Sequence, residues 1–428
     1  MKKNILVFPC GSEVALEIHR SLRYSTHFKL IGASSVDDHG KFVYEDYVDS
    51  FPFFNSPDFI PKVKEIIKEK NISAIFPAMD LVARSLKSYE MELGCIVIGS
   101  DFTVTSICSS KSAIYQRLKD VVPCPLWTHN LTKIEQFPVF IKPDEGYGSR
   151  NVSLAKDLCQ ARAFVDERGG ERGFIFCEYL PGEEYTIDCF SDRTGKILFH
   201  GARKRARVSN GISVNTVAAD MHIDLFKETA EAINVELRPR GAWFFQMKEN
   251  HAGQPVLMEV AARLGGSSGY FRAKGVNFAM LSAFDAFDIS VSVQTNTYKV
   301  VLDRALGSRY KIDLDYECVY VDFDDCLVVD NKVNKELVSF LFQSLNYGKR
   351  LILITRHAEN IEESLQRLRL NGIFDKIINV QNSELKSNYI NQCSSAIFID
   401  DSFAERLDVA ERCKINVFSP DMIEALLN

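Results

Sequence analysis

The chain has 428 residues, of which 46% are hydrophobic and 25% are charged, and its formal net charge is −6 at pH 7. This composition is typical of a globular protein, and the length predicts two to three domains. The slight acidic excess argues against a dedicated nucleic-acid-binding protein, which needs basic charge for phosphates. Eleven cysteines without a CxxC pair indicate reduced thiols, and no window holds the roughly 18–20 apolar residues of a membrane span. We therefore expect a cytoplasmic protein with neither nucleic-acid nor membrane partners.

Residues 1–105 alternate short apolar runs with amphipathic ones. NILVFPC and FKLIGAS are typical of buried strands, whereas EVALEIHRSL and IPKVKEIIKEK have the period of helices. Such alternation predicts a parallel sheet that is covered by helices. We expect this segment to form a βα domain of its own.

Two further segments follow. In residues 106–302, apolar runs such as FIFCEYL, EYTIDCF and KILFHGARKR lie close together with turn residues between them, which predicts antiparallel sheets and an α+β domain. Residues 303–317 read as a linker. Residues 318–428 return to strict βα alternation, which predicts a second parallel sheet of Rossmann-like form. The expected fold class is a multidomain protein with both α/β and α+β parts.

A lysine and a glycine-rich loop follow one of the middle strands. In FPVFIKPDEGYGSRNV, Lys142 ends the strand, and Gly146, Gly148 and Ser149 form the loop. Such a loop brings backbone N–H groups close to phosphate oxygens, and the lysine adds a cation. The spacing is not that of a P-loop, and the alternative is a flexible hairpin with a surface lysine.

Acidic and basic side chains recur at later strand ends. Glu178 and Glu184 flank a Pro-Gly turn, Glu259 ends an apolar strand ahead of Arg263, and the run ARKRARV spans residues 202–208. A carboxylate at a buried strand end needs a partner or a metal ion. The alternative for the basic run is a solvated strand face.

Together these elements resemble the ATP-grasp superfamily over about residues 1–300, closest to the branch similar to carbamoyl-phosphate synthase large subunits and pyrrolysine-pathway ligases. The resemblance implies a leading (pre-ATP-grasp) domain at 1–105 and an ATP-grasp domain at 106–302. It assigns Lys111 and Lys142 to the ATP phosphates and Gly146 to Ser149 to a flap above them. Glu178 is expected at the adenine–ribose hinge, and Glu184 on the ribose or adenine.

The same resemblance assigns the chemistry. Arg203 and Arg205 would face the phosphates, Gln246 and Glu259 would hold Mg²⁺, Arg263 would hold the acyl-phosphate or substrate carboxylate, and Arg272 would line the acceptor side. Many relatives have Asn two residues after the glutamate, where this chain has Ala261, so one magnesium ligand differs. The implied reaction is ATP-dependent joining of a carboxylate to an amine through an acyl-phosphate.

Polar side chains also follow the apolar strands of the last segment, beginning with CVYVDFDDCLVVD at 318–330. Ligands gather at the carboxyl ends of parallel strands, so these side chains are expected to share one crevice. The alternative is a loop of solvated aspartates. The set comprises Asp322, Asp324, Thr355, Lys386, Asp400 and Asp401.

These residues resemble the motifs of haloacid dehalogenase (HAD) phosphatases. The resemblance implies that Asp322 is the nucleophile, that Asp324 is the general acid and base, and that Thr355 and Lys386 hold the phosphoryl group. Asp400 and Asp401 would complete a Mg²⁺ site with Asp322 and Asp324. The short gaps between the motifs leave no room for a full cap domain, which suits a large or protein-presented substrate.

The resemblances together predict a bifunctional enzyme: an ATP-grasp ligase fused to a magnesium-dependent HAD phosphatase, with one substrate passing between the two activities in metabolite or surface-sugar biosynthesis. ATP and Mg²⁺ are the expected cofactors, and small carboxylates and amines, one of them phosphorylated, the expected partners. Relatives are often dimers, so a homodimer is one expected state. Two alternatives remain open: a ligase with a catalytically silent docking or regulatory module, and a nucleotide-binding sensor without turnover.

Overall fold

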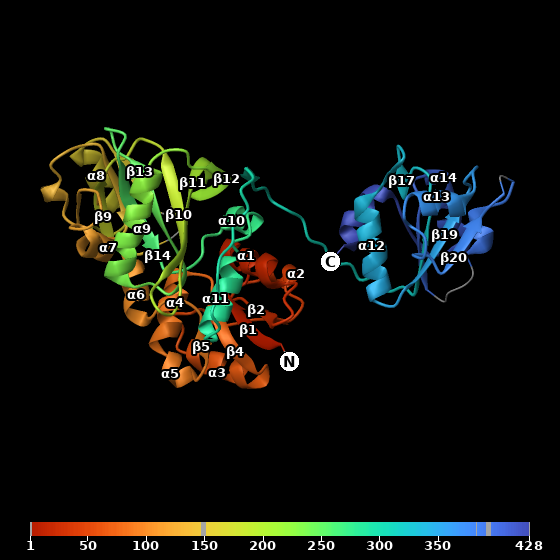
Figure 1. The fold of residues 1–428 in the computed structure, drawn as a ribbon, viewed down its shortest axis with the longest axis horizontal. Helices are drawn as coiled ribbons and strands as arrows, with labels where there is room; N and C mark the ends of the chain where they lie inside the picture. The colour runs from red at the N-terminus through yellow and green to blue at the C-terminus, as the bar shows by residue number, and fades with distance from the viewer. Residues whose placement is uncertain (1, 147–150, 382, 391–394, 428) are drawn as a thin grey trace. The chain divides into compact units, whose positions relative to one another are not determined.

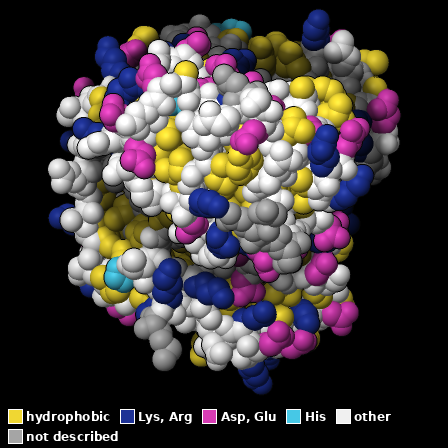
Figure 2. Space-filling model, turned by 90° about the vertical axis from the view of Figure 1, so that its right-hand side faces the viewer, with side chains coloured by type: hydrophobic (Ala, Val, Ile, Leu, Met, Phe, Trp, Pro, Cys, Tyr) yellow, Lys and Arg dark blue, Asp and Glu magenta, His cyan; other side chains and the backbone are white. Residues whose placement is uncertain are grey.

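The computed structural model describes residues 2–146, 151–381, 383–390 and 395–427. The chain divides into two compact units, residues 1–307 and 308–428 (Figure 1), and the division falls inside the predicted linker. None of the described helices is long and apolar enough to cross a bilayer. Figure 2 shows acidic and basic side chains interspersed over one face, with hydrophobic side chains in small groups between them.

The first unit begins with the predicted parallel sheet, whose strand order is β3-β2-β1-β4-β5. Its strands are β1 (Lys3–Phe8), β2 (Phe28–Ala33), β3 (Tyr47–Val48), β4 (Ile72–Pro77) and β5 (Ile96–Val97), and its helices are α1 (Glu13–Leu22), α2 (Gly40–Val43), α3 (Phe59–Glu69), α4 (Asp80–Ser88) and α5 (Glu90–Leu93). Helix α1 begins where Ser12 Oγ accepts a hydrogen bond from the backbone N–H of Ala15 at 3.2 Å, as an N-cap does. This cap fixes the turn between β1 and α1, which borders the site described below.

Two antiparallel sheets form the rest of the first unit, as predicted. The smaller sheet has the order β6-β9-β7-β8 and the larger β14-β13-β10-β11-β12-β15. The strands are β6 (Trp127–Thr128), β7 (Val139–Pro143), β8 (Ser153–Ala155), β9 (Phe174–Glu178), β10 (Glu184–Ser191), β11 (Ile197–Ser209), β12 (Ile212–Ala218), β13 (Gly241–Glu249), β14 (Pro255–Ala261) and β15 (Leu302–Asp303). The helices are α6 (Phe102–Cys108), α7 (Lys111–Leu118), α8 (Leu158–Asp166), α9 (Ile223–Leu237), α10 (Gly269–Ala273) and α11 (Phe278–Ala286), with a 3₁₀ turn, η1 (Leu131–Lys133).

One hydrophobic core crosses the predicted boundary at residue 105. Ile5 of β1 and Ile18 of α1 share it with Phe190, Phe271 and Phe278 of the later segment. Figure 1 shows α11 beside α1 and the leading strands, although these elements lie far apart in the sequence. The structure therefore does not separate residues 1–105 and 106–302 into two compact units.

The second unit is a parallel five-stranded sheet of order β20-β19-β16-β21-β22. Its strands are β16 (Cys318–Val321), β19 (Arg350–Thr355), β20 (Lys376–Asn379), β21 (Ala396–Ile399) and β22 (Asn416–Phe418), and β17 (Val328–Val329) pairs with β18 (Lys332–Val333). Its helices are α12 (Lys335–Asn346), α13 (Ile361–Arg367) and α14 (Phe403–Cys413), with 3₁₀ turns η2 (Lys386–Tyr389) and η3 (Pro420–Leu426). Strand order reverses at β16, which places a crevice at the carboxyl ends of the central strands.

Burial on both faces explains why these strands are apolar throughout. Along β16, Val319 and Val321 enter one hydrophobic core, whereas Cys318 and Tyr320 enter the other. Nine of the described cysteines are free thiols, but Cys318 is disulfide-bonded, so the expectation of reduced thiols is wrong at this position.

Candidate functional site

A cavity of about 810 Å³ lies in the first unit, between the larger antiparallel sheet and the turns that follow β1 and β4. Strands β10 to β14 supply one wall, and the turns at Gly11–Val14 and Ala78–Leu81 supply the facing wall. Of the residues that the sequence assigned to ATP chemistry, the cavity is lined by Lys111, Gly146, Arg203, Arg205, Gln246, Glu259 and Arg263.

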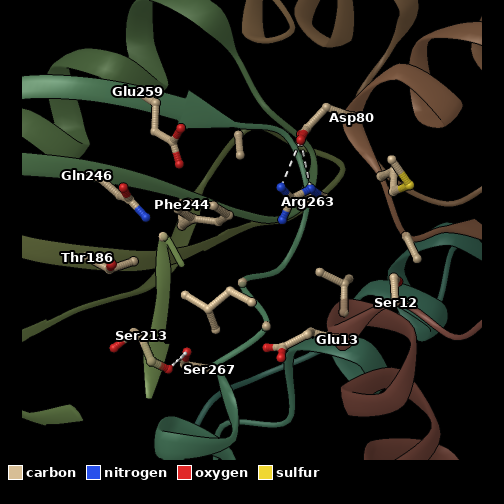
Figure 3. Close-up of a pocket in the computed structure, with 18 of the residues that line it drawn as sticks. Ser12, Glu13, Asp80, Thr186, Ser213, Phe244, Gln246, Glu259, Arg263 and Ser267 are labelled. Atoms are coloured by element: carbon tan, nitrogen blue, oxygen red, sulfur yellow. Dashed lines mark hydrogen bonds and ion pairs between the residues drawn. The ribbon is translucent and has the colours of Figure 1, made fainter. Parts of the chain in front are cut away.

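Gln246 and Glu259 lie opposite each other on the paired strands β13 and β14. Figure 3 shows both side chains directed into the cavity from neighbouring strands. Glu259 has no hydrogen bond or ion pair to any residue that the structure describes, although Lys111 and Arg205 lie close enough to act on it electrostatically. One amide oxygen and one free carboxylate form a donor set that fits Mg²⁺.

Two arginines on β11 line this cavity, and each keeps one donor nitrogen unpaired. Arg203 Nε donates to Asp188 Oδ2 at 2.6 Å, and both side chains are buried. Arg205 pairs with Glu184 and donates from Nη2 to the carbonyl of Gly211 at 2.6 Å. Arg203 Nη1 and Arg205 Nε are buried without a partner among the described residues. Unpaired buried donors are rare in folded proteins, so these atoms fit a polyanionic ligand.

The two predicted phosphate-binding lysines differ in position. Lys111 lines the cavity, with Nζ 3.0 Å from the carbonyl of Pro143, and burial lowers its pKa while Glu259 opposes that shift. Lys142 does not line this cavity; its Nζ is buried and donates to the hydroxyl of Tyr115 at 2.8 Å. In this structure Lys142 is therefore not positioned to contact a phosphate in the cavity, and that contact stays a prediction.

Arg263 joins the two walls of the cavity. Its Nη2 and Nε donate to Asp80 Oδ2 at 2.8 and 3.0 Å, and Asp80 is the first residue of α4 (Figure 3). The sequence assigned Arg263 a role but gave Asp80 none, since 183 residues separate the pair.

Several predicted residues lie elsewhere. Glu178 borders a second cavity, of about 250 Å³, and accepts a hydrogen bond from the backbone N–H of Leu126 at 3.3 Å. Arg272 does not line the main cavity, because its Nε is bound to buried Glu17 at 2.7 Å. The structure therefore does not bring Arg272 into this cavity, and its role on the acceptor side stays a prediction. Of the predicted flap residues, Gly148 and Ser149 lie outside the described residues.

The start of the predicted linker also belongs to the first unit. Leu302 and Asp303 form β15, which pairs with β12, and Arg304 lines the cavity. A two-residue strand has too short a pattern to be recognised in sequence, so the linker was predicted to start too early.

In the second unit, three charged side chains meet at the carboxyl ends of β16 and β21. Lys386 Nζ lies 2.7 Å from Asp322 Oδ1 and 2.6 Å from Asp400 Oδ2, and all three residues are buried. Carboxylate oxygens of Asp322, Asp400 and Asp401 lie within 4.8 Å of one another, a spacing that fits one divalent cation.

The pKa values of the side chains in this cluster are shifted from their ordinary values. Burial raises the pKa of Asp322 to about 6, with Asp400 adding to the shift and Lys386 opposing it. Burial also raises the pKa values of Asp400 and Asp401. Burial alone would lower the pKa of Lys386, but its two carboxylate neighbours raise it overall.

The remaining predicted residues surround this cluster. Thr355 ends β19, and its Oγ1 is buried without a partner among the described residues. Asp324 lies outside the group of three carboxylates, and its oxygens are 2.9 and 3.0 Å from Nδ1 of His357. The sequence missed His357, although its position two residues after Thr355 was a usable signal. Its Nε2 lies 3.0 Å from Ser364 Oγ, which orients the ring.

Comparison with known proteins gives a family match for part of the chain. Residues 171–304 match a family described as ATP-grasp in the biosynthetic pathway with Ter operon. No curated protein matches the chain. The family match ends at residue 304, so it does not bear on the second unit.

Solved structures resemble the chain over about two thirds of its length. The biotin carboxylase domain of Hydrogenobacter thermophilus 2-oxoglutarate carboxylase, a dimer with MgADP, ADP and bicarbonate, has a TM-score of 0.58 at 14% identity and covers 69% of this chain and 73% of its own. N5-carboxyaminoimidazole synthetase from Staphylococcus aureus has a TM-score of 0.55 at 13% identity, and the match covers 69% of this chain and 81% of the synthetase. L-amino acid ligase from Bacillus licheniformis has a TM-score of 0.53 at 18% identity, and the match covers 67% of this chain and 74% of the ligase. At these identities the likeness shows a shared fold alone. The part of the chain that also matches the ATP-grasp family model, residues 171–304, holds β9 to β15.

Proposed function

We propose that the first unit is an ATP-dependent carboxylate–amine ligase that works through an acyl-phosphate. The observation that carries this proposal is the pairing, in one cavity, of the free carboxylate of Glu259 beside Gln246 with the unpaired donors of Arg203 and Arg205. Oxygen ligands and guanidinium donors together suit a metal-bound triphosphate. An L-amino acid ligase and N5-carboxyaminoimidazole synthetase are among the proteins of similar fold.

In the proposed reaction, a carboxylate oxygen attacks the γ-phosphorus of ATP, the bond to ADP breaks, and an acyl-phosphate forms. The amine nitrogen then attacks the acyl carbon, and phosphate leaves as the amide forms. Lys111, Arg203 and Arg205 would bind the phosphoryl oxygens, and Arg263 would hold the substrate carboxylate after leaving Asp80. Mg²⁺, held by Gln246 and Glu259, would supply charge neutralisation for the transferring phosphoryl group.

The test is ADP release by the full chain with pooled carboxylates and amines, phosphorylated amines included, followed by mass detection of the product. We expect ADP only when a carboxylate and an amine are both present, and a product equal in mass to their sum less one water. ATP binding without ADP release under any mixture would instead favour the nucleotide-binding sensor.

For the second unit we propose a phosphatase of the HAD type that works through an aspartyl-phosphate. It is supported by the convergence of Asp322, Lys386 and Asp400 at strand ends, with the unpaired hydroxyl of Thr355 beside that edge of the sheet. Asp322 would attack phosphorus while Asp324 gives a proton to the leaving oxygen. Water, deprotonated by Asp324, would then release phosphate from Asp322.

The test for this second activity is magnesium-dependent hydrolysis of p-nitrophenyl phosphate by the full chain and by its Asp322→Asn variant. The proposal predicts that the parent chain hydrolyses the ester and that the rate of the variant falls to the background of the assay. Equal rates in the two proteins, or none in either, would favour a silent docking or regulatory module.

A further inference from the structure

The cavity of the first unit has one charged pair that the proposed steps leave unused. Arg304 follows β15, and its Nη1 donates to the carbonyl oxygen of Ser213 at 3.2 Å and to Ser267 Oγ at 3.1 Å. Its Nη2 pairs with the carboxylate of Glu13, the first residue of α1. Both Glu13 and Arg304 line the cavity.

The loop that carries Ser267 leaves space for this pair. A Cβ atom at Gly266 would lie 3.3 Å from Cβ of Glu13, which is closer than most Cβ contacts in proteins. The side chain of Glu13 is 44% exposed, whereas that of Arg304 is 18% exposed. A ligand in the cavity can therefore displace Glu13 from Arg304 more easily than it can move Arg304, which is also held by Ser213 and Ser267.

This pair lies across the cavity from Gln246 and Glu259, the predicted metal ligands. Figure 3 shows Gln246 and Glu259 on one side and Glu13, Ser213 and Ser267 on the other. An amine that attacks an acyl-phosphate has to approach from the side that the nucleotide does not occupy. The end with Glu13 and Arg304 meets this requirement.

We propose that Glu13 and Arg304 form the acceptor subsite, and that the acceptor is an amine that also carries an anionic group, a carboxylate or a phosphate. The anionic group takes the place of Glu13 on Arg304, and the released Glu13 carboxylate binds the ammonium group. One ion pair within the protein is thereby exchanged for two with the ligand. An amine without an anionic group can pair with Glu13 but leaves Arg304 without a carboxylate or phosphate partner, so it binds more weakly. The inference rests on the proposed ligase function.

The experiment measures binding without turnover, by titration calorimetry of the full chain saturated with a non-hydrolysable ATP analogue. The probes are matched pairs that differ in one anionic group: the standard amino acids against their amides, and ethanolamine phosphate against ethanolamine. Three variants are compared with the parent chain: Arg304→Met, Arg304→Lys and, as control, Arg207→Met. Arg207 contacts Asp303 at 2.7 Å from an exposed position and does not line the cavity.

We expect the anionic member of at least one pair to bind about 10- to 100-fold more tightly, the range of a charge-assisted hydrogen bond. Arg304→Met should remove that preference, Arg304→Lys should keep part of it, and Arg207→Met should leave it unchanged. The pair that shows the preference identifies carboxylate or phosphate as the anion. No preference in the parent chain, or an equal preference in Arg304→Met, overturns the inference.

ADP release is scored separately on the same proteins. Tight binding of anionic amines without ADP release from any carboxylate mixture would refute the ligase and keep the subsite. ADP release that is as fast with neutral amines would keep the ligase and refute the subsite.

Discussion

Replacing Lys386 with Met tests how the second unit holds its buried charges. Lys386 Nζ contacts Asp322 at 2.7 Å and Asp400 at 2.6 Å, and the three side chains are 4%, 9% and 1% exposed. Removing one partner of a buried ion pair lowers the free energy of unfolding by about 3–5 kcal/mol, because the other charge stays buried and unpaired. With a urea slope of about 2 kcal/mol per molar, typical of a small domain, the unfolding midpoint of this unit falls by about 2 M.

Two tryptophans make the assay specific to each unit. Trp127 and Trp243 both belong to the first unit, so tryptophan fluorescence follows that unit, while far-UV circular dichroism follows both. We expect the dichroism transition alone to shift, and Mg²⁺ to restore part of the loss by replacing the missing positive charge. The control is Lys349→Met, since Lys349 lies 3.7 Å from an Asp315 side chain that is 99% exposed, a kind of pair that contributes at most about 1 kcal/mol. An equal shift in the two variants would refute the argument.

Three further predictions use other residues. Glu259→Gln should lower the rate of ADP release about 100-fold or more with little change in unfolding temperature, because in the proposed reaction its carboxylate holds the nucleotide's metal, and it pairs with no described residue; unchanged release contradicts this. Thr355→Val should slow p-nitrophenyl phosphate hydrolysis about 100-fold yet unfold no earlier than the parent chain, since the Thr355 hydroxyl is buried without a described partner. Partial burial would raise the pKa of Glu249, but hydrogen bonds from Tyr185, from the backbone of Glu183 and from His222 lower it overall. Glu249 therefore stabilises the fold above its unfolded pKa near 4.5, and the stability difference between the parent chain and Glu249→Gln, measured by urea unfolding, should disappear as the pH falls through the lower folded value; a difference that persists at pH 2 would contradict this.

The sheet of the second unit and most of the residues at its edge could be predicted from the sequence. Alternating apolar strands and helices predict a parallel sheet, and the parallel arrangement brings Asp322, Lys386 and Asp400 to one edge. The resemblance to HAD phosphatases grouped Asp324 with the metal ligands. Its carboxylate instead meets His357, and that direction depends on side-chain contacts that strand periodicity does not encode.

In the first unit, periodicity predicted the sheets but not the contacts between distant segments. Gln246 and Glu259 could be placed together because they sit on consecutive hairpin strands. The pairs that Arg263 forms with Asp80, and Arg304 with Glu13, join residues 183 and 291 positions apart. Nothing in a single sequence specifies such pairs. They follow from the shared core that packs the leading sheet against the later helices.

The most direct test of the ligase uses a carboxylate substrate labelled with ¹⁸O in both carboxyl oxygens, once the ADP-release screen has identified an active pair. In an acyl-phosphate mechanism, one labelled oxygen is carried into the phosphate that leaves when the amine attacks. The account therefore predicts phosphate that contains one ¹⁸O atom for every amide formed, in step with ADP release. Unlabelled phosphate, or ADP formed without an amide, would contradict it.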